Sequence, residues 1–434
     1  MYAMRLRQAI LGLLGVTLLA AAYVYGAGYP EISPSEHSPP TAFDSAAVAR
    51  GAELASLGNC GVCHTRPDGP SYAGGRPMAT PFGTIFTTNI TPDVETGLGR
   101  WSEPAFLRAM QEGVRRDGAH LYPAFPYDHF TKVSAADLRA IYAFLMTREP
   151  VRAQTPPNEL QFPFQFRELI AGWKLLFFRP GEFKPDPVLS PVLNRGAYLT
   201  EGLAHCGACH TPRNVFGAER HGKYLGGGEA EDWHAPALNA SSTAPVAWTN
   251  DQLFAYLRHG FVDPHGVAAG PMRPVADNLG KVNEHDVKAI ASFIGAMLAP
   301  STTDRREKVA SRALGAPAEN KVDGALIYAG ACALCHEPNG QSFSARGIHL
   351  TASKVLAMPD PRNLAHVIID GIEAPVATPS AQMPGFADVL TDPQIIALMT
   401  YLRANFTDKT PWTGLPEAVR TAKGEAERSK TPRW

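Results

Sequence analysis

The pentapeptide Cys-x-x-Cys-His occurs three times in this chain and constrains its fold more than any other feature. The copies begin at Cys60, Cys206 and Cys332, and together they use all six cysteines of the 434 residues. This pattern is the attachment site of c-type haem, whose iron is ligated by the histidine. A four-ligand zinc site usually needs two cysteine pairs, so an odd number of pairs fits zinc badly. We therefore predict three covalent haems c.

The three motifs supply the predicted attachment and proximal-ligand residues. These are Cys60, Cys63, His64, Cys206, Cys209, His210, Cys332, Cys335 and His336. Because no cysteine lies outside the motifs, structural disulfides and a cysteine nucleophile are excluded. Formal net charge is −1 and there is no basic block, which argues against nucleic acid as a partner.

The motifs lie 146 and 126 residues apart, a period that indicates an internal repeat of domain size. A similar segment with a shared Gly-Ala pair precedes each motif, at 50–54, 195–199 and 323–328. Each repeat ends in an apolar pattern of helical spacing, at 137–146, 286–298 and 392–406. The predicted fold is mainly α, with three tandem class I cytochrome c domains whose first and last helices pack together, behind an N-terminal transmembrane helix.

These patterns divide the chain into seven parts. They are an N-terminal membrane anchor or signal at 1–29, a first cytochrome domain at 44–152, an aromatic connecting segment at 153–188, a second domain at 189–300, a linker at 301–318, a third domain at 319–408 and a polar tail at 409–434.

The N-terminus predicts the compartment. Arg5 and Arg7 precede an uncharged stretch from Ala9 to Ala27, which as a helix of roughly 28 Å would nearly match a bilayer core. Ala20 to Ala22 is an alternative site for a signal peptidase. The positive flank stays in the cytoplasm, so we predict an inner-membrane protein on the periplasmic side, where c-type haem is attached.

Two other segments are unusual. The connecting segment holds Phe162–Phe166 and Leu169–Pro180, which are aromatic and apolar, flanked by Arg167 and Arg179, and too short to span a membrane. One interpretation is a helix packed between two haem domains; the other is a surface that lies in a membrane interface or covers a partner subunit. The tail from Pro411 to Trp434 is polar and contains proline. It is either disordered, which we expect, or an arm that lies on a partner.

The sixth iron ligand should come from the loop before the last helix of each domain. Met272 in the second domain and Met383 in the third each lie beside a proline in that loop. Methionine opposite histidine raises the haem potential. Met358 is the rival in the third domain, but it precedes an expected helix instead.

The first domain breaks this pattern, because Phe125 occupies the place where methionine is expected. His129 lies in the same loop and is the first candidate for the sixth ligand. Bis-histidine ligation would then give this haem the lowest potential of the three. The other candidates are His120, Met78, Met110 and Met146, and a five-coordinate iron is the remaining alternative.

Taken together, the motifs resemble a known family, the tri-haem cytochrome c subunit of bacterial membrane-bound dehydrogenases. The resemblance is carried by Thr88–Asp93, Thr96–Ser102, Tyr122–Tyr127 and Leu169–Pro180, and it covers the chain from the anchor to about Phe406. The family serves alcohol, gluconate, sorbitol, aldehyde, nicotinate and isoquinoline dehydrogenases. Its alcohol dehydrogenase branch has methionine at the position of Phe125, and this chain departs there. The run Leu121–Phe130, followed by Leu145–Arg148, is more similar to the branch that serves molybdenum hydroxylases.

The resemblance implies an electron-transfer subunit with no substrate chemistry of its own. Electrons would pass from a periplasmic catalytic subunit, with an iron–sulfur subunit if it is of the molybdenum type, to ubiquinone or another cytochrome. Four alternatives stay open: a quinoprotein alcohol dehydrogenase partner, a flavin gluconate or sorbitol dehydrogenase partner, a terminal-oxidase cytochrome subunit, and a peroxidase-like enzyme with an open haem.

Overall fold

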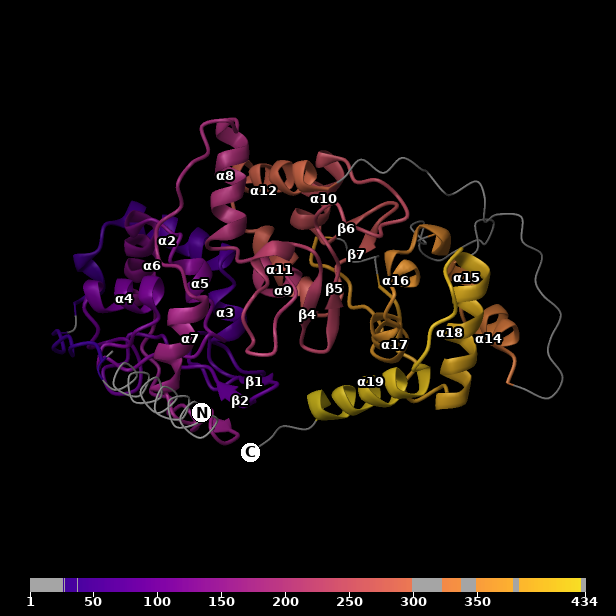
Figure 1. Ribbon diagram of the computed structural model, residues 1–434, viewed down its shortest axis with the longest axis horizontal. Coiled ribbons are helices and arrows are strands. Elements are labelled where there is room, and N and C mark those ends of the chain that lie inside the picture. The colour runs from indigo at the N-terminus through magenta and orange to yellow at the C-terminus, as the bar shows by residue number, and fades with distance from the viewer. Residues whose placement is uncertain are drawn as a thin grey trace, which may run out of the picture. The chain divides into compact units, whose positions relative to one another are not determined.

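The computed structural model describes residues 26, 28–36, 38–298, 322–336, 349–377 and 382–430. The predicted linker at 301–318, and the predicted anchor apart from Gly26, Gly28 and Tyr29, lie outside these residues. Among the described helices, none is both long and apolar enough to cross a bilayer. The chain forms two compact units, one of Met1–Val188, Tyr198–Ala208 and Arg213–Glu219, the other of Leu189–Ala197, Cys209–Pro212 and Arg220–Trp434. Figure 1 shows that helices dominate both.

The first unit is built from short helices and one small sheet. Its elements are η1 Pro40–Ala42, α2 Ser45–Leu57, α3 Cys60–Cys63, β1 Pro77–Thr80, β2 Gly83–Phe86, α4 Glu103–Glu112, α5 Tyr127–Phe130, α6 Ala135–Met146, β3 Glu159–Leu160 and α7 Leu169–Phe177. The three strands are antiparallel in the order β1-β2-β3, with Met78 opposite Ile85 and Gly83 opposite Leu160.

The helices α8 Pro191–Glu201 and α9 Gly207–His210 contribute residues to both units. The second unit then continues with η2 His221–Lys223, β4 Gly228–Ala230, β5 Trp233–Ala235, α10 Asn250–His259, β6 Phe261–Val262, β7 Gly266–Val267, α11 Met272–Leu279, α12 Glu284–Met297, α14 Gly324–Ala331, α15 Ala333–His336, η3 Leu350–Ala352, α16 Lys354–Ala357, α17 Arg362–Ile369, α18 Asp392–Phe406 and α19 Leu415–Lys430.

The predicted helices before and after each motif are confirmed. Each later helix begins at a polar cap: Ser134 accepts a hydrogen bond from Asp137 N, Asn283 accepts one from Asp286 N, and Thr391 forms a capping box with Gln394. These caps satisfy backbone N–H groups that the first helical turn leaves without partners.

One glycine in each early helix lies against the later helix of the same repeat. A Cβ atom added there would stand 1.9 Å from Ala140 O at Gly51, 2.1 Å from Ala289 O at Gly196, and 2.2 Å from Ala397 O at Gly324. No side chain fits at such a distance from a backbone carbonyl. The pairs α2 with α6, α8 with α12 and α14 with α18 therefore repeat one close helix crossing, and only glycine permits it.

The expectation of a disordered polar tail is wrong for the described part of that segment. α19 packs against α17 and α18, and its inner face carries buried Leu415, Val419 and Ala422. Trp412, just before it, donates from Nε1 to Met358 O at 2.9 Å. The apolar residues recur every three to four positions on one face, a spacing that polar neighbours obscured in the sequence.

The helix α7 carries a lysine on its buried side. Lys174 is 8% exposed, and its ammonium donates to Glu112 O at 2.6 Å, to Gly113 O at 2.8 Å and to His120 Nδ1 at 3.1 Å. It therefore satisfies carbonyls at the C-terminus of α4, where a cation is also favoured by the helix dipole. Burial lowers the pKa of Lys174 to about 8.

Candidate haem-attachment sites

The first motif is shaped by a left-handed residue between two helices. α2 ends at Leu57, and Asn59, with a φ of 52°, turns the chain into the short helix α3 that carries Cys60 and Cys63. His64 follows, and its Nδ1 lies 2.6 Å from Thr88 O. Because a carbonyl only accepts, Nδ1 carries the proton, and Nε2 is left as the nitrogen that can bind iron.

The second motif has the same left-handed turn and the same histidine–carbonyl hydrogen bond. His205, with a φ of 37°, makes the turn before Cys206, and His210 Nδ1 lies 2.7 Å from Pro236 O. Burial lowers the pKa of His210 to about 4 and also lowers that of His64. Both imidazoles are therefore neutral near pH 7, which is the form that ligates a metal.

The third motif shares the internal hydrogen bond of the first, although the residue before Cys332 is not left-handed. The backbone N–H of His336 donates to Cys332 O at 3.2 Å, as that of His64 donates to Cys60 O at 2.9 Å. Residues 337–348, which follow it, lie outside the described chain. None of the six cysteines is in a disulfide, so each motif presents two cysteines and a histidine in one helical turn. These residues fit covalent haem c.

Of the two candidate methionine ligands, Met383 lies in a loop as expected, whereas Met272 lies at the start of a helix. Met272 is the first residue of α11, ahead of α12. Met383 precedes α18 and is held by two backbone hydrogen bonds with Ile372, of 2.8 and 2.9 Å. By contrast, Met358 is 3% exposed and its sulfur accepts a hydrogen bond from Asn363 Nδ2 at 3.5 Å. Met358 thus has a packing role, and ligation by Met272 and Met383 stays a prediction.

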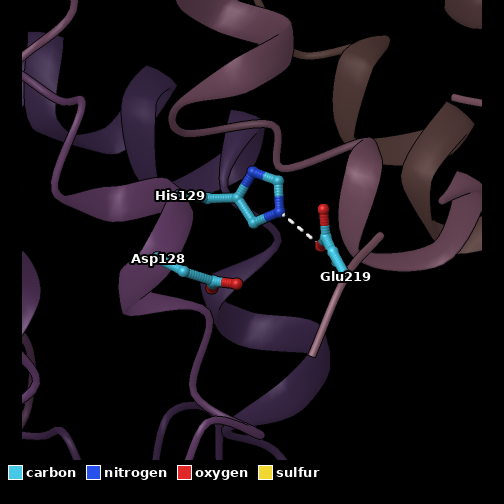
Figure 2. Close-up of side chains that lie close together, drawn as sticks. All are labelled: Asp128, His129 and Glu219. Carbon is cyan, nitrogen blue, oxygen red and sulfur yellow. Dashed lines mark hydrogen bonds and ion pairs between the residues drawn. The ribbon is translucent and has the colours of Figure 1, made fainter. Parts of the chain in front are cut away.

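His129 lies in a buried polar cluster of the first unit. Its Nδ1 donates to Glu201 O at 2.8 Å, and its Nε2 lies 2.7 Å from Glu219 Oε1. Figure 2 shows Asp128 beside this pair, and the ligand atoms of the three side chains lie within 4.8 Å of one another. Both ring nitrogens therefore have protein partners, and iron ligation by His129 would require it to leave Glu219. Ligation by His129 stays a prediction.

The structure also shows where the other candidates for the sixth ligand of the first haem lie. Met110 in α4 and Met146 in α6 are buried in the core, Met78 lies in β1, and His120 accepts the hydrogen bond of Lys174 described above. Phe125 packs against Phe130, with ring centroids 5.2 Å apart.

Replacing Glu219 by glutamine should change how stability depends on pH. Burial alone lowers the pKa of His129, but the hydrogen bond and charge of Glu219 outweigh it and hold that pKa above its ordinary value. The pair therefore stabilises the folded chain fully below about pH 6.5, and the contribution is lost as pH rises through the folded-state pKa. We expect Glu219→Gln to cost about 1–3 kcal/mol at low pH and less at high pH.

Hydrogen exchange over α5, measured from about pH 6 to 9, checks this expectation. Glu201→Gln is the matched control, because His129 bonds to the backbone oxygen of Glu201, which the substitution keeps. The Glu201 carboxylate pairs instead with Lys132, at 2.8 Å near the surface. An equal loss in both variants at every pH would contradict the role of the His129–Glu219 pair.

Sequence reasoning missed several residues that the structure brings to these sites. The carbonyls of Thr88 and Pro236 orient the two histidines from 24 and 26 residues away. No local pattern in the sequence identifies the partners of Glu219 and Lys174. The one signal that a comparison of the repeats would have offered is the similar number of residues between His64 and Thr88 and between His210 and Pro236.

Comparisons with known proteins agree with this geometry. The family model described as cytochrome c matches residues 48–149, and the one described as cytochrome c oxidase, cbb3-type, subunit III matches residues 319–402. The fold and the motifs together define a c-type cytochrome.

Similar curated proteins narrow the class. The gluconate 2-dehydrogenase cytochrome c subunit of Pantoea cypripedii is 35% identical over 408 residues, covering 89% of this chain and 90% of the relative. The cytochrome c subunit of the quinone alcohol dehydrogenase of Gluconacetobacter polyoxogenes is 34% identical over 386 residues, covering 85% and 82%. The chain belongs to the family of cytochrome c subunits of dehydrogenase complexes.

A further relative is much longer than this chain. It is a subunit of the nicotinate dehydrogenase of Pseudomonas putida, and it is 44% identical over 395 residues, which is 89% of this chain. The match covers only 32% of that relative, so this chain corresponds to about a third of it.

Proposed function

We propose that this chain carries three covalent haems c in three cytochrome c domains, at 44–152, 189–300 and 319–408. The repeated glycine crossing at Gly51, Gly196 and Gly324 is the observation that supports this organisation. The equivalent histidine–carbonyl bonds of His64 and His210 support equivalent haem sites. The connecting segment at 153–188 and the linker at 301–318 join the domains.

Haem c supplies reversible one-electron chemistry when bound. The chain's contribution is to fix the imidazoles of His64 and His210 in one tautomer, as Thr88 O and Pro236 O do. Met272 and Met383 would supply the second iron ligand in their domains. His129 is the proposed sixth ligand of the first haem. Burial of the histidines sets the local polarity, and with it the potential.

The proposed partner is the catalytic subunit of a periplasmic molybdenum hydroxylase that oxidises an aldehyde or an N-heterocycle, together with an iron–sulfur subunit. The 44% identity to a nicotinate dehydrogenase subunit supports this choice. Electrons would leave for ubiquinone or another cytochrome. We propose that the chain is held at the inner membrane, on its periplasmic side, by the segment before residue 29.

A second candidate is a cytochrome subunit of a terminal oxidase. The match of residues 319–402 to an oxidase subunit model favours it. That match covers the third repeat alone, whereas the dehydrogenase relatives cover at least 85% of the chain. We therefore prefer the dehydrogenase complex.

Purification of the native complex from detergent-solubilised membranes tests the proposal. We expect three haems per chain by intact mass, and molybdenum with iron–sulfur in co-purifying subunits. Pyrroloquinoline quinone or flavin in their place would overturn the molybdenum partner but keep the electron-transfer role. Co-purifying subunits with copper and b-type haem would favour the oxidase. Strong CO binding by the reduced chain, purified without partners, would favour an enzyme with an open haem.

A further inference from the structure

The surface around α7 in the first unit is apolar where a helix is normally polar. Phe162, Phe166, Leu169, Leu175, Leu176 and Phe216 are all exposed, and we call these six residues the apolar α7 surface. Leu175 and Leu176 are 58% and 63% exposed, whereas Lys174, which points into the unit, is only 8% exposed. This arrangement reverses the usual placement of leucine and lysine in a water-soluble helix.

The helix cannot rotate to bury its leucines. Leu169 and Leu176 are seven residues apart and so share one face, while Ala171 and Lys174 occupy the buried side. Lys174 is fixed by its hydrogen bonds to Glu112 O and Gly113 O. Rotation would leave those carbonyls without a donor, at a cost of about 1–3 kcal/mol for each buried group.

The rest of the apolar α7 surface is also held in place. Trp173 Nε1 donates to Phe216 O at 3.0 Å, and the rings of Phe177 and Phe216 lie 5.8 Å apart. Phe162 and Phe166 pack edge to face at 6.2 Å. The exposed side chains thus form a preorganised surface, and Figure 1 shows α7 within the first unit.

The chain's path indicates what covers this surface. Tyr29 follows the uncharged stretch 9–27 by two residues, and its ring lies 6.0 Å from Lys174 Nζ and 5.7 Å from the His120 ring. The next residues are bound to the same unit, with Arg108 donating to Pro30 O at 2.8 Å and Ile32 N donating to Arg116 O at 2.9 Å. The segment between the uncharged stretch and the first unit is therefore short and pinned.

Because residues 29–32 are bound to the first unit, the position of the segment before them also fixes the position of α7. If stretch 9–27 enters a bilayer, residue 29 lies at its surface, and Tyr29 holds α7 there as well. Charge agrees with this placement, because residues 162–181 contain two cations outside the buried side of α7, Arg167 and Arg179, and one anion, Glu168. Aromatic and leucine side chains with adjacent cations suit the interface of an anionic bilayer.

We propose that the apolar α7 surface inserts into the interfacial region of the membrane, as a second contact beside the N-terminal segment. This inference rests on the proposed membrane location and adds to it a specific orientation, with α7 of the first unit facing the lipid.

Photo-crosslinking of the full-length holoprotein tests this proposal. A benzophenone amino acid is placed at position 176, in vesicles of phosphatidylethanolamine and phosphatidylglycerol that carry a tagged phospholipid. Position 188 is the matched control, because Val188 is an apolar residue that is 88% exposed and lies outside the apolar α7 surface. We expect several-fold more lipid adduct at position 176 than at 188. Equal yields at the two positions would overturn the proposal.

The same probes in the native complex separate the alternatives. Crosslinks from position 176 to a co-purifying subunit, without lipid adducts, would overturn the lipid contact in favour of a protein partner. A chain that does not associate with the vesicles at all would overturn the proposed membrane location itself. Leu176→Glu should keep its haem content but restore fast amide exchange of α7 on vesicles, whereas unchanged exchange protection would contradict the inference.

Discussion

Gly324→Ala should destabilise the helix pair α14–α18 by about 1–3 kcal/mol, which is the typical cost of overpacking a close-packed contact. The new Cβ would stand 2.2 Å from Ala397 O and 2.8 Å from the Cβ of Tyr401. Both atoms belong to α18 and have no flexible end that can move aside. The helices would have to separate, and with them the third haem-attachment motif would lose its support.

The same helix contains its own control. Gly330 has nothing within 4 Å of an added Cβ, so Gly330→Ala should stabilise α14 by about 0.4–1 kcal/mol through reduced freedom of the unfolded chain. Amide exchange over residues 324–331 and 392–406 in the holoprotein measures both changes. Losses of similar size in the two variants would mean that the crossing does not depend on glycine.

Met383→Leu should remove the sulfur ligand of the third haem. We expect that haem to lose the long-wavelength absorption of a methionine-bound ferric iron and to bind CO when reduced. Its potential should fall by a measurable part of the roughly 0.8 V range that axial ligands set. Leucine keeps the size of the side chain, so folding should be preserved. Redox titration and CO difference spectra make the measurement.

Met358→Leu is the matched control in the same repeat. Met358 is buried in the core, with its sulfur on Asn363 Nδ2, so this change should alter stability slightly and leave the haem spectrum intact. The opposite outcome, with the spectrum lost in Met358→Leu and retained in Met383→Leu, would exchange the roles of the two methionines.

Much of the fold could be predicted because its signals are local. The helices before and after each motif follow from apolar spacing and from caps such as Ser134 and Asn283. The packing of α19 was missed, because its apolar positions are separated by Glu417, Arg420 and Lys423, which lower the average hydropathy without breaking the buried face.

In the candidate sites, too, the residues with local signals could be predicted and the distant partners could not. The thiols and the histidine of each motif are contiguous, so the pentapeptide itself identifies them. The orienting carbonyls of Thr88 and Pro236 are backbone atoms, which no residue type reveals. Glu219 meets His129 across 90 residues, and a lone glutamate gives no sign of such a partner.

The sequence by itself determined the haem-attachment residues, the helical character and the family, because these depend on neighbours along the chain. Only the tertiary structure decided which glycines form the helix crossings, which groups hold each histidine, and which side of α7 faces outward. The apolar composition of α7 is equally consistent with a helix packed in a core and with a helix that lies at a membrane or partner interface. In the folded chain Lys174 marks the inner side of α7, because its ammonium donates to the carbonyls at the end of α4.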